Sequence, residues 1–325
     1  MIKKKLHIEE FILESREKLR DLTVTFHHRE GSGKTVWIFH ALSASSDPFE
    51  WWLDVMNGSW LSPDDQLICV NMLGSCYGTE FSTAIDSKGD LVELPLITVR
   101  DNAKLFSIVA EYLSVDRIDI GIGGSLGGSC LLEWKLIQSD LFDKVIALAS
   151  STKESVWGKA AHYAQRKALR EDEFFNIGKY DSATRGIMQA RTIGMLTYRS
   201  RASFEVMQAD EESLLKDFQV ESYLKYQEKK FAERFDAKSY FLLSQTLDTH
   251  DIFRDRREVI IKGRVLLIGI STDYLCSIQD QEQLLDVCPE GKMKIIESIY
   301  GHDGFLVESK KINELILQFL EDEKQ

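Results

Sequence analysis

One short segment of the sequence combines a serine with the glycines that a nucleophile turn requires. Gly123-Gly124-Ser125-Leu126-Gly127 fits the pattern G-x-S-x-G, and it lies between an apolar β-branched run, 118–122, and the helix-like segment 129–137. A tight strand-to-helix turn strains the backbone of the serine, and small neighbours avoid a clash with the adjoining strand and helix. The segment predicts that Ser125 is a nucleophile. The alternative is a glycine-rich turn that only caps a helix.

A serine hydroxyl needs a base, and the base needs an orienting acid. Asp273 follows the apolar run 265–270 by a few residues, and His302 follows the next strand-like run. Both residues fall on loops at the sheet edge where Ser125 would emerge, in the chain order Ser, Asp, His. We therefore expect a Ser125/His302/Asp273 triad. Asp280 and Asp303 remain alternatives to Asp273, and each is also explained as a turn or helix-cap carboxylate.

Acyl chemistry at this serine also needs two hydrogen-bond donors for an oxyanion. The helix N-terminus behind Ser125 offers the Leu126 N–H, and the loop His40-Ala41-Leu42-Ser43, after the first buried strand, offers the Leu42 N–H. We expect His40 to shape this loop or to pack rather than to act as the base. The remaining histidines are expected at solvated or core-edge positions; they are His7, His27, His28, His162 and His250.

The elements that must position these residues alternate between strand and helix. A turn at 30–33 suggests a hairpin from the alternating segment 22–26 into the buried run 36–39. Further short apolar runs predict a mostly parallel sheet covered on both faces; they lie at 67–70, 118–122, 145–148, 265–270 and 294–296. From about residue 153 to 250 the sequence instead shows long, charged segments with helical periodicity. We expect an α/β-hydrolase fold with core residues 1–152, a helical lid at 153–250 and core residues 251–325.

Composition narrows the class of protein. The 325 residues are 44% hydrophobic, which suffices for one large core plus an insertion. A net charge of -12, spread along the chain, argues against a nucleic-acid or anionic-membrane partner. The five cysteines are far apart and suggest neither a disulfide framework nor a metal site. No run of about 18 apolar residues occurs, so we expect neither secretion nor a membrane span. We expect a cytoplasmic protein.

Several segments together resemble the homoserine O-acetyltransferases, from about residue 22 to the C-terminus. The lid segments are the more specific part, since many hydrolase-fold proteins share the serine turn and the triad. The matching segments are His40-Ala41-Leu42-Ser43, Trp51-Trp52, Asn71-Met72-Leu73-Gly74-Ser75-Cys76-Tyr77-Gly78, 123–128 with Glu133-Trp134, 300–306, and, within the lid, 190–199, 218–224 and 234–237.

The resemblance implies acetyl transfer from acetyl-CoA to the hydroxyl of L-homoserine by a ping-pong route, on the way to methionine, without a bound cofactor. It also implies that Arg191 and Asp303 hold the amino acid substrate. A lid is required if an alcohol is to outcompete water for the acyl-serine. The same insertion is suited to dimerisation, so we expect a homodimer through the lid helices. Its cations could compensate for the negative charge of CoA; they are Arg166, Lys167, Arg170, Arg185, Arg191, Arg199 and Arg201.

Two segments depart from the family pattern. The chain after Gly78 continues with the short Thr79-Glu80-Phe81-Ser82 where a longer Gly-Pro loop is usual, and Ser43-Ala44-Ser45 stands where Thr-Gly is usual. Both lie near the expected acyl pocket. The alternatives are therefore a carboxylester hydrolase or thioesterase with the same triad, a transferase that uses succinyl-CoA or serine, and a catalytically silent protein used for binding.

Overall fold

A single mixed sheet organises the computed structural model, which describes residues 1–211 and 215–322. Within these residues the nine strands run in the order β1-β2-β4-β3-β6-β7-β8-β9, and β5 pairs with β2. Their bounds are β1 (Ile2–Ile12), β2 (Lys18–Arg29), β3 (Thr35–Phe39), β4 (Gln66–Val70), β5 (Thr83–Ile85), β6 (Ile118–Gly124), β7 (Phe142–Leu148), β8 (Arg264–Ile270) and β9 (Gly291–Ile296).

Strand direction brings the ends of distant segments to one edge. From β4 through β3, β6, β7 and β8 to β9 every neighbouring pair is parallel. The predicted mostly parallel sheet is confirmed. The predicted hairpin is wrong, because β4 lies between β2 and β3, and β2 pairs instead with β1 in a long antiparallel ribbon. The turn at Gly31 reverses the chain without pairing the two strands beside it.

Each inner strand divides its side chains between two cores. In β3, Trp37 and Phe39 face one core, and Val36 and Ile38 face the other, as the two-residue period of a strand requires. The first core packs against α3 (Val99–Tyr112), α4 (Leu126–Ile137) and α11 (Ile278–Leu285). The second packs against α2 (Leu53–Met56) and α13 (Ser309–Glu321). Helices on both faces therefore fix the sheet edge that bears the site.

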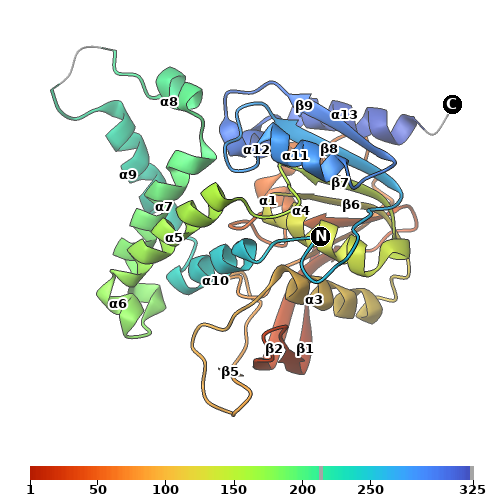
Figure 1. The fold of residues 1–325 in the computed structure, drawn as a ribbon, viewed down its shortest axis with the longest axis horizontal. Coiled ribbons are helices and arrows are strands. Elements are labelled where there is room, and N and C mark those ends of the chain that lie inside the picture. Colours follow the sequence, from red (N-terminus) through yellow and green to blue (C-terminus); the bar gives the residue numbers. More distant parts are fainter. Residues whose placement is uncertain (212–214, 323–325) are drawn as a thin grey trace.

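The range 153–250 contributes helices and no strand among its described residues. They are α5 (Val156–Arg170), α6 (Glu173–Asn176), α7 (Thr184–Tyr198), α8 (Arg201–Met207), α9 (Gln219–Ala232) and α10 (Ala237–Asp248). The first five stand to one side of the sheet, and α10 lies between them and the core (Figure 1). A bridge between Lys153 and Asp251 and a hydrogen bond from the Glu154 N–H to the His250 carbonyl (2.9 Å) join the two ends of this range.

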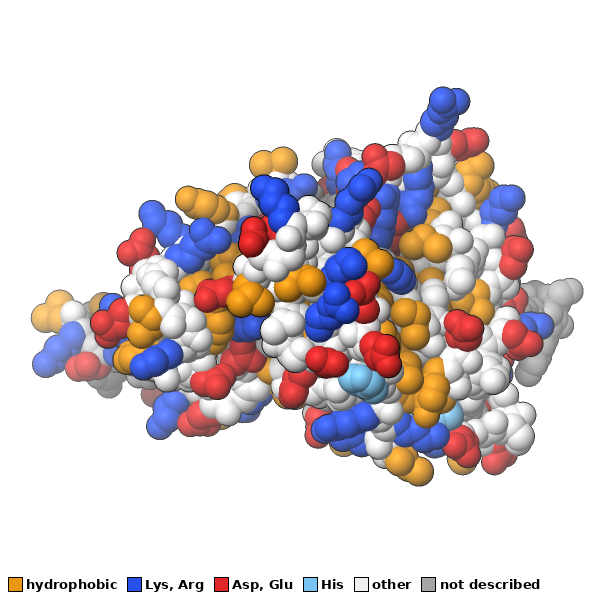
Figure 2. Space-filling view, turned by 90° about the horizontal axis from the view of Figure 1, so that it is seen from below, with side chains coloured by type: hydrophobic (Ala, Val, Ile, Leu, Met, Phe, Trp, Pro, Cys, Tyr) orange, Lys and Arg blue, Asp and Glu red, His pale blue; other side chains and the backbone are white. Residues whose placement is uncertain are grey.

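Short helices complete the described chain: α1 (Pro48–Trp51), α12 (Gly304–Val307), and the 3₁₀ turns η1 (Ser139–Leu141), η2 (Tyr180–Ser182) and η3 (Gly301–Asp303). On the face shown in Figure 2, cationic and anionic side chains are interspersed. Within the described residues, no helix has the length and apolarity to cross a membrane, and no group of three or more His, Cys, Asp or Glu side chains is placed to hold a metal ion. The five cysteines are free thiols.

Candidate active site

Ser125 stands at the turn between β6 and α4 in a conformation that few side chains adopt. Its φ is 56° and its ψ is -126°, and its N–H donates to the Leu148 carbonyl at 3.0 Å. A Cβ at Gly123 would lie 2.8 Å from the Phe39 Cβ, and one at Gly127 would lie 2.3 Å from the Phe39 carbonyl oxygen. The two outer glycines are thus needed because α4 and β3 approach this turn so closely.

Three side chains from three loops form a hydrogen-bonded chain at the carboxyl edge of the sheet. His302 Nε2 lies 2.8 Å from Ser125 Oγ, and His302 Nδ1 lies 2.7 Å from Asp273 Oδ2. Asp273 follows β8 and His302 lies in η3, so the parallel strands carry both to the end of β6. The structure therefore brings together the three residues that spacing predicted, at distances that allow proton transfer from Ser125 to His302 and orientation of His302 by Asp273.

The surroundings of His302 favour its protonated form. Burial by itself lowers the pKa of this histidine, but the charge and hydrogen bond of Asp273, aided by Asp303 and Glu154, outweigh burial and raise it. Asp273 is held in place by the N–H groups of Leu275 (2.8 Å) and Cys276 (3.0 Å), which both donate to its Oδ1. Its other oxygen, Oδ2, faces the histidine.

The two alternative carboxylates have other partners. Asp280 accepts from the N–H (3.1 Å) and hydroxyl (2.6 Å) of Ser277 and so belongs to the capping box of α11. Asp303 lies beside the histidine in sequence, but its Oδ2 forms an ion pair with Arg199 Nε at 2.9 Å. Neither carboxylate therefore contacts the His302 ring by a hydrogen bond within the described residues.

The two expected oxyanion donors lie on either side of the nucleophile. Leu126 is the first residue of α4, and Leu42 follows β3; neither N–H has a hydrogen-bond partner in the part of the chain that the structure describes. His40 fixes the Leu42 loop, since its Nδ1 is 2.8 Å from the Ala41 carbonyl and its Nε2 accepts the Met72 N–H at 3.0 Å. Burial lowers the pKa of His40 to about 4, so the ring is neutral.

Arg191 and Asp303, the expected substrate residues, lie close enough for their charges to interact. Arg191, on α7, packs its guanidinium over the rings of Phe231 (4.8 Å) and Tyr198 (5.6 Å). Its buried Nε has no hydrogen-bond partner among the described residues. Burial raises the pKa of Asp303, and the cations Arg199 and Arg191 oppose that rise. Among the described residues, Arg191 thus has no carboxylate in an ion pair, while the nearby Asp303 is already paired with Arg199.

A hollow of about 360 Å³ opens between the Leu42 loop and the lid. Arg191, Lys230 and Arg234 supply three cations to its wall against the single carboxylate of Glu50. Arg234 also donates to the Ser43 carbonyl at 2.7 Å, so a lid helix end is tied directly to the loop that departs from the family pattern.

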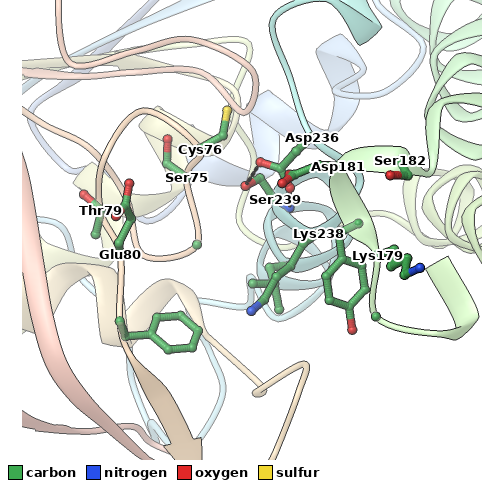
Figure 3. A pocket seen from close by; sticks show the side chains of 15 residues that line it. Ser75, Cys76, Thr79, Glu80, Lys179, Asp181, Ser182, Asp236, Lys238 and Ser239 are labelled. Carbon is green, nitrogen blue, oxygen red and sulfur yellow. Dashed lines mark hydrogen bonds between the residues drawn. The ribbon is translucent and has the colours of Figure 1, made fainter. Parts of the chain in front are cut away.

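A second hollow, of about 570 Å³, lies between the loop 74–81 and the lid (Figure 3). Its charged side chains are Lys179 and Lys238 against Glu80, Asp181 and Asp236. No triad residue lines either hollow, and the two hollows differ in their place and in the sign of their charge.

A scan against family models found no match. The chain is 33% identical to a homoserine O-acetyltransferase of Cyclobacterium marinum over 325 residues, covering 96% of this chain and 93% of the relative. The chain belongs to the homoserine O-acetyltransferase family. A crystal structure of homoserine O-acetyltransferase from Staphylococcus aureus matches with a TM-score of 0.82 and 27% identity, over 98% of this chain and 95% of that one.

The fold extends beyond the homoserine O-acetyltransferase family. Esterase E22 superposes with a TM-score of 0.82 at 17% identity, over 98% of this chain and 99% of that one, which shows a shared fold only. The family and the α/β-hydrolase fold expected from the sequence are thereby confirmed. The triad geometry alone does not separate a transferase from an esterase, because both chemistries begin with an acyl-serine.

Three residues near the triad had no part in the predicted triad, oxyanion hole or amino acid site. Arg199, which was expected only among the cations of the lid, pairs with Asp303. His162, expected at a solvated or core-edge position, lines a small hollow together with Ser125. Glu154 lines the same hollow, and nothing in its sequence context marks it, since an acid before a helix is common.

Proposed function

We propose that the protein transfers an acetyl group from acetyl-CoA to the hydroxyl of L-homoserine through an acyl-serine at Ser125. The observation that carries this proposal is the hydrogen-bonded chain from Ser125 through His302 to Asp273, near Arg191, whose buried Nε has no hydrogen-bond partner among the described residues. The reaction would serve methionine biosynthesis.

The first half-reaction moves the acyl group to the enzyme. His302 Nε2 takes the hydroxyl proton as Ser125 Oγ forms a bond to the thioester carbon, and the carbonyl electrons move to an oxyanion facing the Leu42 and Leu126 N–H groups. As the carbonyl re-forms, the carbon–sulfur bond breaks and the thiolate takes the proton from His302. Asp273 keeps the histidine in the tautomer that accepts at Nε2, through its 2.7 Å contact with Nδ1.

The second half-reaction reverses these roles with an alcohol. The substrate hydroxyl gives its proton to His302 as its oxygen attacks the acyl carbon, and Ser125 Oγ takes the proton back when the acyl bond breaks. An amino acid also brings a carboxylate and an ammonium group that must be paired to aim the hydroxyl. Arg191 would bind the carboxylate, and Asp303 the ammonium through the oxygen that Arg199 does not occupy.

The donor would enter through the 360 Å³ hollow. CoA is polyanionic and the chain carries a net charge of -12, so a local excess of cations is needed. Even with Arg191 reserved for the acceptor, Lys230 and Arg234 outnumber Glu50 there, whereas acids outnumber lysines in the 570 Å³ hollow. No bound cofactor is required by this chemistry.

Release of CoA with and without the acceptor tests the proposal. A transferase releases CoA from acetyl-CoA much faster when L-homoserine is present, because the lid holds the alcohol in attacking position. Equal release in both reactions would identify a thioesterase instead. Substituting succinyl-CoA or L-serine in the same assay tests the two other substrate pairs, and faster turnover with either would overturn the substrate assignment.

A homodimer through the lid helices is also proposed. On α5, Val156, Ala160 and Tyr163 recur at helical spacing on one exposed face, and the exposed fractions of Val156 and Tyr163 are 86% and 66%. Such an apolar stripe is costly in water and is covered when two copies pack α5 against α5.

Five free cysteines suit a reducing compartment, and we propose that the protein is cytoplasmic.

A further inference from the structure

A water-sized hollow lies beside the nucleophile, and it shares no lining residue with the cationic hollow of about 360 Å³. Its volume is about 20 Å³, and both Ser125 and His302 line it. The opposite wall comes from the segment between β7 and α5 and from α5 itself, through Ser150, Glu154 and His162. The space is therefore closed by the first part of the lid, where the chain leaves β7 and enters α5.

Glu154 is the acid in this wall, and its side chain has an unusual position. It folds back over the first turn of α5, where one carboxylate oxygen would lie only 1.6 Å from a Cβ at Gly158. Only a glycine leaves room for the carboxylate there. Within the described residues the Glu154 carboxylate forms no hydrogen bond and no ion pair, unlike Asp303 and Asp273.

The charges around Glu154 do not compensate for its burial. Burial raises the pKa of this carboxyl to about 7, and Asp248 adds to the rise, while His162, His302 and Lys159 oppose it. The charge of Glu154 also contributes to the raised pKa of Tyr198 and of Cys276. His162 is itself bonded to Asp248 at 2.7 Å, so its proton on that side is already engaged. Above neutral pH the hollow therefore contains an unpaired negative charge.

The acyl-serine places one group in this direction. Besides Ser125 Oγ, the tetrahedral carbon bears an oxyanion, the leaving or attacking group, and the rest of the acyl chain. The oxyanion faces Leu42 and Leu126, and the thiol or alcohol must reach His302 Nε2 from the Arg191 side. The acyl chain is left to point into the small hollow that Ser125 lines.

We propose that Glu154 determines acyl specificity, by closing this hollow around a two-carbon acyl group and repelling acyl chains that end in a carboxylate. The inference rests on the proposed function and names its donor class. A longer chain meets the wall, since the volume accepts about one methyl group. A succinyl chain meets in addition the like charge of Glu154, which Lys159 and the two histidines offset only in part.

Acylation of Ser125 by different donors tests this directly. Wild type, Glu154→Gln and Glu154→Ala are mixed with acetyl-, propionyl- or succinyl-CoA at pH about 8, without acceptor, and the acyl-enzyme is followed by quench and intact mass; Glu154 is ionised there because its pKa is about 7. Rates are compared as ratios to acetyl, so that effects on the shared triad cancel. Glu171→Gln, a charge change at the exposed far end of α5, is the matched control.

We expect Glu154→Gln to raise the succinyl-to-acetyl ratio about tenfold and to leave the propionyl-to-acetyl ratio unchanged, because charge alone is removed. Glu154→Ala should raise both ratios about tenfold or more, and Glu171→Gln neither. Ratios within about twofold of wild type in both Glu154 variants would overturn the inference while leaving the acyl-serine intact. A wild type that forms no adduct with any donor would instead overturn the proposed function, and the inference with it.

Discussion

Asp273→Asn should disable the enzyme through the tautomer of His302. Oδ1 of Asp273 accepts two backbone N–H groups, from Leu275 and Cys276, so an asparagine must keep its carbonyl oxygen at that position. Its NH₂ group then occupies the place of Oδ2, 2.7 Å from His302 Nδ1. A donor there makes Nδ1 the acceptor and puts the ring proton on Nε2, facing Ser125 Oγ. The histidine can then no longer take the serine proton.

The expected loss in kcat is roughly 10⁴-fold, or about 5.5 kcal/mol of transition-state stabilisation. Initial rates of CoA release from acetyl-CoA with L-homoserine measure it, beside a thermal unfolding curve that shows each variant is folded. Asp280→Asn is the control, because Asp280 only caps α11 through Ser277. A loss below about 100-fold in Asp273→Asn, or an equal loss in Asp280→Asn, would refute the reasoning.

Three other predictions concern the acceptor, the base and the assembly. Arg191→Ala should slow deacylation by L-homoserine at least about tenfold and leave acylation by acetyl-CoA nearly normal in rapid-quench experiments, whereas equal damage to both half-reactions would contradict its role. Because Asp273 and nearby acids raise the pKa of His302, kcat/KM for acetyl-CoA should fall with decreasing pH through a midpoint above the ordinary 6.5; a midpoint below that value would exclude His302 as the base. In sedimentation velocity the wild type should be a dimer and Val156→Glu a monomer; a dimer that withstands this change would exclude the α5 interface.

Local patterns carried most of what the sequence could predict. The glycines around Ser125 are required by contacts with Phe39, and that requirement is visible as a motif of five residues. Parallel strands end at one edge, so the positions of Asp273 and His302 after their strands predicted that they would meet Ser125. The helical range 153–250 followed from its periodicity.

Contacts between segments far apart in the sequence were harder to predict. The turn at Gly31 looked like a hairpin, yet β4 inserts between the strands on either side, because strand order depends on the whole sheet and not on the turn. The pairing of Arg199 with Asp303 depends on how the lid meets the core, and it leaves no spacing signal in the sequence.

The covalent intermediate is the central claim, and intact mass measures it most directly. Wild-type enzyme mixed with acetyl-CoA alone should gain the mass of one acetyl group, with the modified peptide containing Ser125, and should lose that mass on addition of L-homoserine as O-acetylhomoserine forms. Ser125→Ala should gain nothing under the same conditions. An acetyl group on another residue, an adduct that persists in the presence of L-homoserine, or turnover by Ser125→Ala above about a tenth of the wild-type rate would contradict the mechanism.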